Sequence, residues 1–412
     1  MEHGFFKVVS SAAFRELLAG FPKLGTETVA LGAALGRVLA ADVVAGEDLP
    51  PASRSSMDGY AVRAADLFGA TESNPAYLER VGEIAIDRPP DFALNPGECA
   101  SITTGGFLPE GADSVIMVEH SQDLGAGTVE LRKAVAPHDN VMLRGEDVAA
   151  GQVALPAGKR LRPPEIGLLA ALGQARLRVG ARPRVAILST GDELVPVTAT
   201  PRPGQIRDVN SATLAAIVVE AGAEPQLLGL VPDELDTLAA ALRQAREASD
   251  VILLSGGSSV GVRDLTIAAL ATFPDARVLA HGIQVSPGKP TILAALGEVP
   301  VLGLPGQVTS AQVVMRVFGA PFLRHLAGQA GAFGEEGPGI SAELARNLAS
   351  KQGREDWVRV RLESRPGALP LAHPVLGKSG LLRTLLSADG LVAVPSEREG
   401  LYAGSLVVVR PL

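Results

Sequence analysis

Three loops rich in glycine and hydroxyl side chains each follow a predicted buried strand. They span residues 189–193, 255–261 and 304–307. Backbone amides at glycine turns and helix N-termini bind phosphate groups without a charged side chain. Each loop taken alone is compatible with an ordinary turn. Three such loops at one edge of a sheet favour a phosphate or nucleotide site.

Carboxylates accompany two of these loops. Asp192 and Glu193 lie in the first loop, and Asp264 follows the second. Carboxylates beside a phosphate site would repel the ligand, and a hydrated divalent metal that bridges carboxylate and phosphate oxygens removes this repulsion. The alternative is that these acids only stabilise the N-termini of helices.

A fourth loop presents a lysine. Residues 286–290 read Ser-Pro-Gly-Lys-Pro, in which the prolines fix a turn and Gly288 permits its reversal. Lys289 is thereby placed to meet an oxyanion, the alternative being a solvated turn lysine. The only cysteine, Cys99, has the surroundings of an inert buried thiol rather than a nucleophile. The six histidines show no metal-ligand spacing.

The elements that must position these loops alternate between strand and helix beyond residue 182. The predicted strands are 184–188, 226–230, 251–254, 291–296 and 301–304, and the predicted helices are 211–221, 234–248, 264–272 and 309–326. This alternation indicates a parallel sheet covered on both faces, whose ligands bind beyond the carboxyl ends of the strands.

The rest of the chain is predicted to be mixed before residue 182 and mainly β after a linker at 329–339. Helices are predicted at 10–21, 33–43 and 165–172, and strands at 81–86, 99–103, 114–119, 128–131, 357–362, 391–394 and 401–409. The segments 55–62 and 103–113 have the composition of turns, the former entering a strand. The fold class is therefore multidomain α/β plus β.

Composition limits the partners. The 412 residues are too many for one compact core, which predicts two to four domains. A net charge of −8 and 4% aromatic residues argue against a nucleic-acid or anionic membrane surface. Since no apolar stretch approaches bilayer length and no secretory signal is recognisable, we expect a cytoplasmic protein.

Together these motifs resemble the molybdopterin molybdenumtransferase family, which includes bacterial MoeA and the E domain of gephyrin. The resemblance is nearly chain-long. It comprises SSMDGYAV at 55–62, TTGGFLPEGADSVIMVE at 103–119, RGEDV at 144–148, STGDEL at 189–194, GQIRDVN at 204–210, GGSSVGVRD at 256–264, PGKP at 287–290 and LPGQ at 304–307.

The resemblance implies a protomer of four parts. These are a helical linker segment formed by 5–42 and 144–180, an inserted mainly β domain at 43–143, an α/β molybdopterin-binding domain at 181–326 and a small β-barrel-like domain at 330–412. It also implies a homodimer in which the MDGYA motif faces the active cleft of the partner protomer.

The implied reaction inserts molybdate into adenylylated molybdopterin and releases AMP, with a divalent cation such as Mg²⁺. The catalytic residues carried over are Asp58, Thr104, Glu193, Asp233 and Asp264, of which Asp58, Glu193 and Asp264 would hold metal. The substrate-binding residues are Gly191, Ser255, Gly256, Gly257, Ser259, Gly261, Lys289, Pro305, Gly306, Arg359 and Ser379. The molybdopterin adenylyltransferase and apo-molybdoenzymes are the implied protein partners.

Three departures from the family pattern bear on the rate and on oxyanion preference. Residues 52–54 replace Phe-Asp-Asn, residues 307–308 replace Asn-Pro, and Gly282 and Ser286 replace lysines. The missing lysines predict weak, salt-sensitive use of molybdate. Two other functions remain open: an adenylyltransferase or pyrophosphatase that uses a related nucleotide, and a catalytically weak pterin-binding scaffold.

Overall fold

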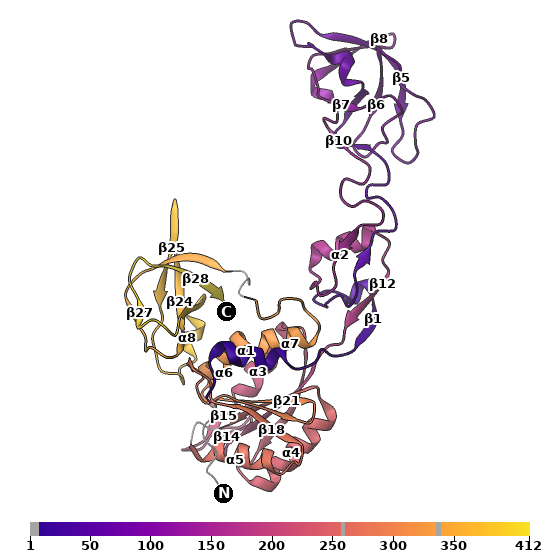
Figure 1. The fold of residues 1–412 in the computed structure, drawn as a ribbon. Helices are drawn as coiled ribbons and strands as arrows, with labels where there is room; N and C mark the ends of the chain where they lie inside the picture. Colours follow the sequence, from indigo (N-terminus) through magenta and orange to yellow (C-terminus); the bar gives the residue numbers. More distant parts are fainter. Residues whose placement is uncertain (1–7, 257–259, 335–338) are drawn as a thin grey trace.

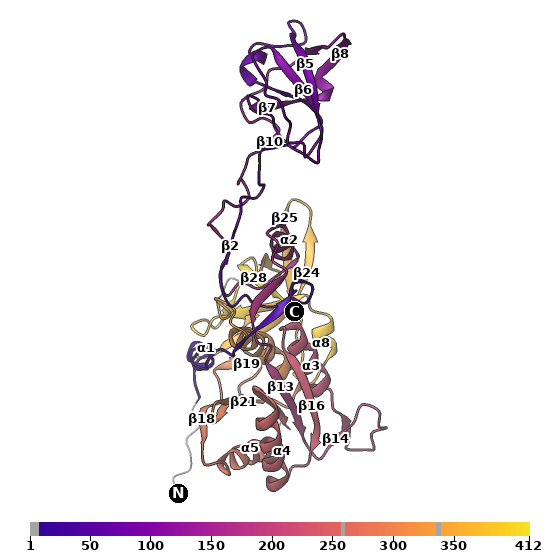
Figure 2. The ribbon, with the colours of Figure 1, turned by 90° about the vertical axis from the view of Figure 1, so that its right-hand side faces the viewer.

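The computed structural model describes residues 8–256, 260–334 and 339–412, and of residues 260–264 it describes the backbone alone. The molecule is elongated. A β domain lies at one end, separated from the remainder by long extended connections in both Figure 1 and Figure 2. An α/β domain lies at the other end, with a second β domain packed beside it. Along the parts of the chain that are described, no helix has both the length and the apolar character needed to cross a bilayer.

The β domain at the far end is a six-stranded sheet in the order β7-β4-β6-β5-β9-β8. Its side chains pack into two buried clusters on either side of the sheet, around Ile116 and Ile102 respectively. The turn and strand predicted for the MDGYA segment are confirmed. The strands are β4 (Gly59–Val62), β5 (Ala76–Ile84), β6 (Glu98–Ile102), β7 (Ser114–Met117), β8 (Ser121–Gly125) and β9 (Thr128–Leu131).

The region between the two ends is built mostly from paired extended segments. They are β1 (Thr26–Ala30) with β12 (Arg176–Gly180), β2 (Val43–Val44) with β11 (Val153–Leu155), and β3 (Arg54–Ser55) with β10 (Val141–Met142). Helix α2 (Pro163–Ala171) confirms the prediction at 165–172.

The helix predicted at 33–43 is wrong. A 3-10 turn, η1 (Leu31–Ala33), ends there, and Gly36 has a φ of 76°. Val38 and Leu39 are buried, but each is bridged to a distant extended segment rather than to a helical turn. Long-range pairing thus overrides the helical spacing of these apolar residues.

The sheet of the α/β domain has the order β16-β13-β17-β21-β20-β18. The first four strands are parallel, which confirms the predicted parallel sheet, whereas β20 and β18 are antiparallel to their neighbours and depart from it at one edge. β21 returns from β20 through a tight turn at Gly297, and β18 was not predicted. The strands are β13 (Arg184–Thr190), β16 (Glu224–Val231), β17 (Val251–Gly256), β18 (Ala276–His281), β20 (Ile292–Leu296) and β21 (Val299–Leu304).

Helices cover both faces of this sheet, as predicted. Val185 and Ile187 of β13 face one buried cluster, and Ala186 and Leu188 face the other, as the alternation of a strand requires. One face is covered by α1 (Ser11–Ala19), α3 (Asn210–Glu220), α6 (Val308–Val314), the π-helical η4 (Met315–Gly319) and α7 (Ala320–Leu326). The other is covered by α4 (Leu235–Ala248) and α5 (Val260–Ala271).

The C-terminal domain is a closed barrel of five strands. β24 pairs with both β25 and β26, and β22 and β28 close the ring between them. A short strand of the α/β domain, β19 (Val285–Ser286), also pairs with β24 and attaches the barrel. The remaining elements are β22 (Ile340–Leu344), β23 (Leu348–Ala349), β24 (Glu355–Arg365), β25 (Ala368–Pro374), α8 (Arg383–Leu386), β26 (Gly390–Val394), β27 (Gly400–Leu401) and β28 (Leu406–Pro411).

Candidate active site

The predicted loops meet at one edge of the α/β sheet. Thr190 at the end of β13 is in register with Val231 of β16 and Gly256 of β17. Ser255 is likewise in register with Leu304 at the end of β21. Because these four strands are parallel, the loops that follow them emerge side by side, as the sequence predicted.

Hydrogen bonds join the loop after β13 to the loop after β16. The Thr190 hydroxyl donates to the carboxylate of Asp233, and the backbone N–H of Asp233 donates to Asp192 Oδ1 at 3.2 Å. Glu193 folds back over Gly191, where a Cβ would lie 2.7 Å from Glu193 Oε2. Glycine at 191 therefore leaves room for the carboxylate of Glu193.

Two buried polar residues at the start of α3 connect the other loops. Asn210, 8% exposed, donates from Nδ2 to Ser255 Oγ at 2.6 Å and to the carbonyl of Gly306 at 2.9 Å. Asp208 accepts from the Ser189 hydroxyl and from the backbone N–H of Ser211, both at 3.1 Å. Sequence reasoning gave neither Asn210 nor Asp208 a role, although both belong to the quoted segment GQIRDVN.

These residues line a pocket of about 480 Å³. Its floor is polar, with Thr190, Ser255 and Asn210, and Glu193 also faces it. Its walls are more apolar: Leu194, Ile206 and Pro201 come from a flap formed by β14 (Leu194–Val195) and β15 (Ile206–Arg207), and Gly380 and Leu382 come from the barrel domain. A pocket of this size, with a few polar groups converging from one side, accommodates a nucleotide-sized ligand.

The barrel domain reaches this pocket through the loop that contains Ser379. The backbone N–H of Thr309, near the N-terminus of α6, donates to the Ser379 carbonyl at 3.1 Å. Arg359 on β24 holds the same loop, since its guanidinium donates to Thr384 Oγ1 at 2.6 Å and to the Gly377 carbonyl at 3.0 Å. Burial lowers the pKa of Arg359. Ser379 is thus adjacent to Gly380, which lines the pocket, and Arg359 is bonded to the same loop, but neither Ser379 nor Arg359 is among the lining residues.

The Lys289 loop precedes β20, whose antiparallel pairing places Ile292 opposite Gly303 of β21. The loop therefore emerges at the same edge as the end of β21. Gly288 has a φ of 123°, and a Cβ there would lie 2.4 Å from Val314 Cγ2, which confirms that the turn requires glycine. Lys289 itself is exposed and is not among the residues that line the pocket.

Asp58 and Thr104 lie together, but in the β domain at the far end of the molecule (Figure 1). Asp58 Oδ1 accepts from the backbone N–H of Thr104 at 2.6 Å and from its hydroxyl at 2.9 Å. These two bonds lower the pKa of Asp58. Gly59, which follows, is in close contact with β7, because a Cβ there would lie 1.9 Å from the Ile116 carbonyl oxygen.

Four predicted site residues are described only in part or not at all. Gly257 and Ser259 lie outside the described residues. Gly261 and Asp264 lie in the first turns of α5, where only the backbone is described. Among the described residues no group of three His, Cys, Asp or Glu side chains is arranged to hold a metal. Within one chain, Asp58 and Glu193 belong to domains at opposite ends.

Fold and pocket define a multidomain α/β protein with its ligand site at the carboxyl edge of a mostly parallel sheet. Three family models match in order: the MoeA N-terminal region, domains I and II, at residues 9–173; a probable molybdopterin binding domain at 186–325; and the MoeA C-terminal region, domain IV, at 341–412. The chain belongs to the molybdopterin molybdenumtransferase family, and its role lies in molybdenum cofactor biosynthesis.

Individual relatives match over almost the whole chain. The molybdopterin molybdenumtransferase of Nostoc sp. is 36% identical over 392 residues, which cover 94% of this chain and 89% of that protein. The molybdopterin molybdenumtransferase of Bacillus subtilis is 34% identical, and the match covers 94% of this chain and 90% of that protein. A solved MoeA structure from Pyrococcus horikoshii, 29% identical, gives a TM-score of 0.80 over 98% of this chain and 100% of that one.

Proposed function

We propose that this protein inserts molybdate into adenylylated molybdopterin, releases AMP and so forms molybdenum cofactor. The pocket at the sheet edge carries the proposal, because the glycine loops, the buried Asn210 and the half-buried Glu193 all face one space. The printed names of the relatives support the same transferase activity. The apolar walls suit the flat rings of the substrate, and the loops after β17 and β21 suit its phosphates.

We propose that a divalent cation such as Mg²⁺ binds at this edge. Glu193 lines a pocket proposed for an anionic substrate, and although Arg207 lines the same pocket, the described residues show no ion pair to Glu193. Glu193 and Asp264 would hold the cation, with Asp58 supplied by another protomer, and oxygen ligands of this kind suit Mg²⁺. When bound, the cation would neutralise phosphate charge. The protein's own contribution is to position the substrate through Asn210 and the loops that it joins.

We also propose that the working unit is a homodimer with shared sites. Asp58 and Thr104 are exposed and paired at the far end of an elongated chain, where the described structure offers them no partner from the α/β domain. A second copy would bring this end to the pocket. Lys289, Arg359 and Ser379 would then meet the anionic groups. A cytoplasmic location, the adenylyltransferase and the apo-molybdoenzymes stay predictions.

The test is AMP release from adenylylated molybdopterin with molybdate or tungstate and a divalent cation. We expect Asp264→Asn and Glu193→Gln to keep pterin binding and lose metal-dependent AMP release by at least about a hundredfold. Asp236→Asn, an exposed carboxylate on α4, is the matched control and should be unchanged. Pterin binding without AMP release by the wild type would instead favour the scaffold. AMP release that is independent of any oxyanion would favour a pyrophosphatase.

A further inference from the structure

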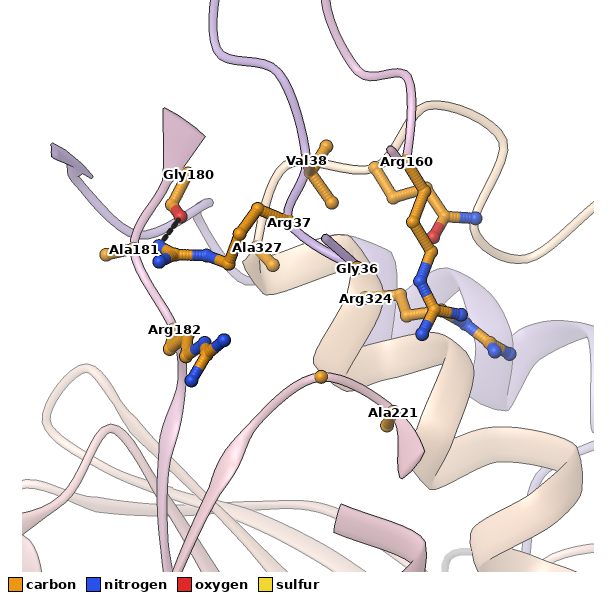
Figure 3. Close-up of a pocket in the computed structure, with 12 residues that line it drawn as sticks. Gly36, Arg37, Val38, Arg160, Gly180, Ala181, Arg182, Ala221, Arg324 and Ala327 are labelled. Atoms are coloured by element: carbon orange, nitrogen blue, oxygen red, sulfur yellow. Dashed lines mark hydrogen bonds between the residues drawn. The ribbon is translucent and has the colours of Figure 1, made fainter. Parts of the chain in front are cut away.

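A second polar site lies at the opposite end of α3 from the active-site pocket. Asn210 at the start of this helix lines the pocket, whereas Ala221, just past its end, lines a small cavity between the connecting region and the α/β domain. Figure 3 shows four arginines around this cavity. They come from separate segments of the chain: Arg37, Arg160, Arg182 and Arg324.

One of these arginines is already neutralised. Arg37 is buried, forms an ion pair with Glu27 and donates to the Gly180 carbonyl at 2.7 Å. The other three are not compensated in this way. Arg160 donates to the backbone carbonyl of Glu220 at 3.3 Å, and Arg182 and Arg324 form no ion pair with any described residue.

Arg160 and Arg324 repel each other at close range. Their guanidinium groups lie beside one another in Figure 3. Burial, and next the positive charge of Arg160, lower the pKa of Arg324, and its Nε is buried without a hydrogen-bond partner. Arg316 adds further positive charge, and Glu220, whose negative charge acts on Arg324 in the opposite sense, forms an ion pair with Arg316 at 2.7 Å.

The carboxyl ends of two helices offset part of the positive charge of these arginines. α3 and α7 both end here, and the carboxyl end of a helix carries about half a negative charge, so the two ends offset about one positive charge. Arg160, Arg316 and Arg324 against Glu220 leave a surplus of two positive charges. Positive charge therefore remains even before the exposed Arg182 is counted.

We propose that this arginine cluster binds a small tetrahedral oxyanion of the phosphate or sulfate class between Arg160 and Arg324. The cavity, about 10 Å³, takes roughly one oxygen atom, so the rest of the anion would lie outside it, and Arg182 on the other side of the cavity (Figure 3) would add only long-range positive charge. Guanidinium groups suit this chemistry because their paired N–H donors match two oxygens of an oxyanion. Since Arg160 lies in the connecting region and Arg324 on α7, the bound anion joins two parts of the molecule. This site is separate from the proposed reaction.

The experiment is thermal unfolding of the full chain with increasing inorganic phosphate, sulfate or glycerol 3-phosphate, at ionic strength held constant with sodium chloride. The wild type should gain a saturable increase in Tm, because an anion that binds the folded state stabilises it by mass action. A response to glycerol 3-phosphate equal to that of phosphate would identify a phosphoryl group of a larger molecule as an acceptable ligand. Arg160→Gln and Arg324→Gln should weaken binding at least about tenfold.

The stability of the protein without bound oxyanion gives a second test. At low salt without oxyanion, Arg160→Gln should be as stable as the wild type or more stable, because the substitution removes like-charge repulsion. Arg80→Gln in the β domain and Lys289→Gln near the active-site pocket are controls that should keep the response of the cluster. The proposal is wrong if chloride alone reproduces the increase in Tm. It is also wrong if both arginine variants keep the wild-type increase in Tm with oxyanion and have a lower Tm in every buffer, because the arginines would then only cap the helices. Arg160→Gln, on a half-exposed residue, stays decisive even if Arg324→Gln does not fold.

Discussion

Asn210 joins two of the loops that form the active-site pocket. Its amide N–H₂ group spans Ser255 after β17 and Gly306 after β21, and the carbonyl of Gly306 can only accept. The donor side of the amide must therefore face these loops. A residue with no donor at this position leaves the Gly306 carbonyl unpaired, whereas the Ser255 hydroxyl can rotate and donate instead.

We predict that Asn210→Asp lowers the free energy of unfolding by about 2 kcal/mol, because a carboxylate oxygen would face the Gly306 carbonyl. AMP release should fall by at least about tenfold, since the loops after β17 and β21 would separate. Urea unfolding and the AMP assay measure the two effects. Thr213→Val is the control on the same helix, since its hydroxyl bonds only to the Asn210 carbonyl, at 3.2 Å. Equal stability of the Asp variant and the wild type would show that Asn210 does not join the loops.

At this scale the sequence predicted the loops better than the residues that connect them. Ser255, Gly256 and Gly306 meet where expected, because the carboxyl ends of parallel strands share an edge. The role of Asn210 could not be predicted, since it depends on how α3 is rotated under the sheet. Cys99 behaves as expected: it is buried, and burial raises its thiol pKa to about 12.

Among the elements, α2 depends on an ion pair at its first turn. Glu165, 6% exposed on its side chain, accepts from the guanidinium and the backbone N–H of Arg162. The hydrogen bond to the Arg162 side chain is the main cause that lowers the pKa of Glu165 from 4.5 to about 2. The pair therefore stabilises the folded state most where Glu165 is ionised in both the folded and unfolded chain.

We predict that Glu165→Gln costs up to about 3 kcal/mol at neutral pH. The folded-state pKa of Glu165 is depressed, so its stabilisation is fully present above pH 4.5 and is lost as the pH falls from there towards 2. The stability difference between wild type and variant should shrink over that interval, as measured by unfolding at a series of pH values. Glu47→Gln, an exposed acid of the same region, is the control. A difference that stays constant down to pH 2 would rule out the ion pair as its source.

The backbone near Lys289 limits where the family's missing lysines, at positions 282 and 286, can be restored. Gly282 is buried with a φ of 105°, and a Cβ there would lie 3.2 Å from Val8 Cγ2. A lysine at 282 would strain the backbone, so adding lysines at both 282 and 286 is the wrong way to test the charge hypothesis. Ser286 lies on β19, is half-buried and has no such constraint.

We predict that Ser286→Lys lowers the molybdate concentration needed for half-maximal AMP release by about tenfold at low ionic strength. Two unit charges about 4 Å apart at an effective dielectric near 20 interact by about 4 kcal/mol, and a fraction of this suffices for a tenfold change. Ser286→Gln, with a long neutral side chain, is the control, and the gain should disappear at high salt. An unchanged requirement in the lysine variant would mean that molybdate is held elsewhere.

The elements that the sequence predicted correctly are those fixed by local pattern. The buried strands and amphipathic helices of the α/β domain fall within a few residues of their predicted positions. The helix wrongly predicted at 33–43 and the strands that were not predicted, such as β18, β22 and β25, are segments whose structure depends on pairing with another part of the chain. Leu39 pairs with Val179, and β18 pairs with β20 across a helix-free connection. Such pairing is not encoded in the periodicity of either segment alone.

On the scale of the whole molecule, the structure separates two sets of candidate site residues, as the family resemblance implied for the MDGYA motif. The chain carries the Asp58–Thr104 pair on one end and the Glu193 pocket on the other, joined by short paired segments (Figure 2). A chain of this shape can bring both sets of residues to one substrate if two copies lie side by side.

We therefore predict that two inactive variants restore activity when mixed. Asp58→Asn removes one carboxylate from the β domain, where the remaining amide oxygen still accepts from Thr104, and Glu193→Gln removes one from the pocket. In a dimer with shared sites, a mixed pair holds one intact site, formed by Asp58 of one protomer and Glu193 of the other. Random exchange at equal concentrations makes half of the dimers mixed, each with one of two sites intact, so AMP release should recover to about a quarter of the wild-type rate. Mixing two samples of the same variant is the control and should recover nothing. Subunit exchange, followed by energy transfer between labelled protomers, must be shown to occur in the same mixture. If exchange is complete and no activity returns, Asp58 and Glu193 do not act in one shared site.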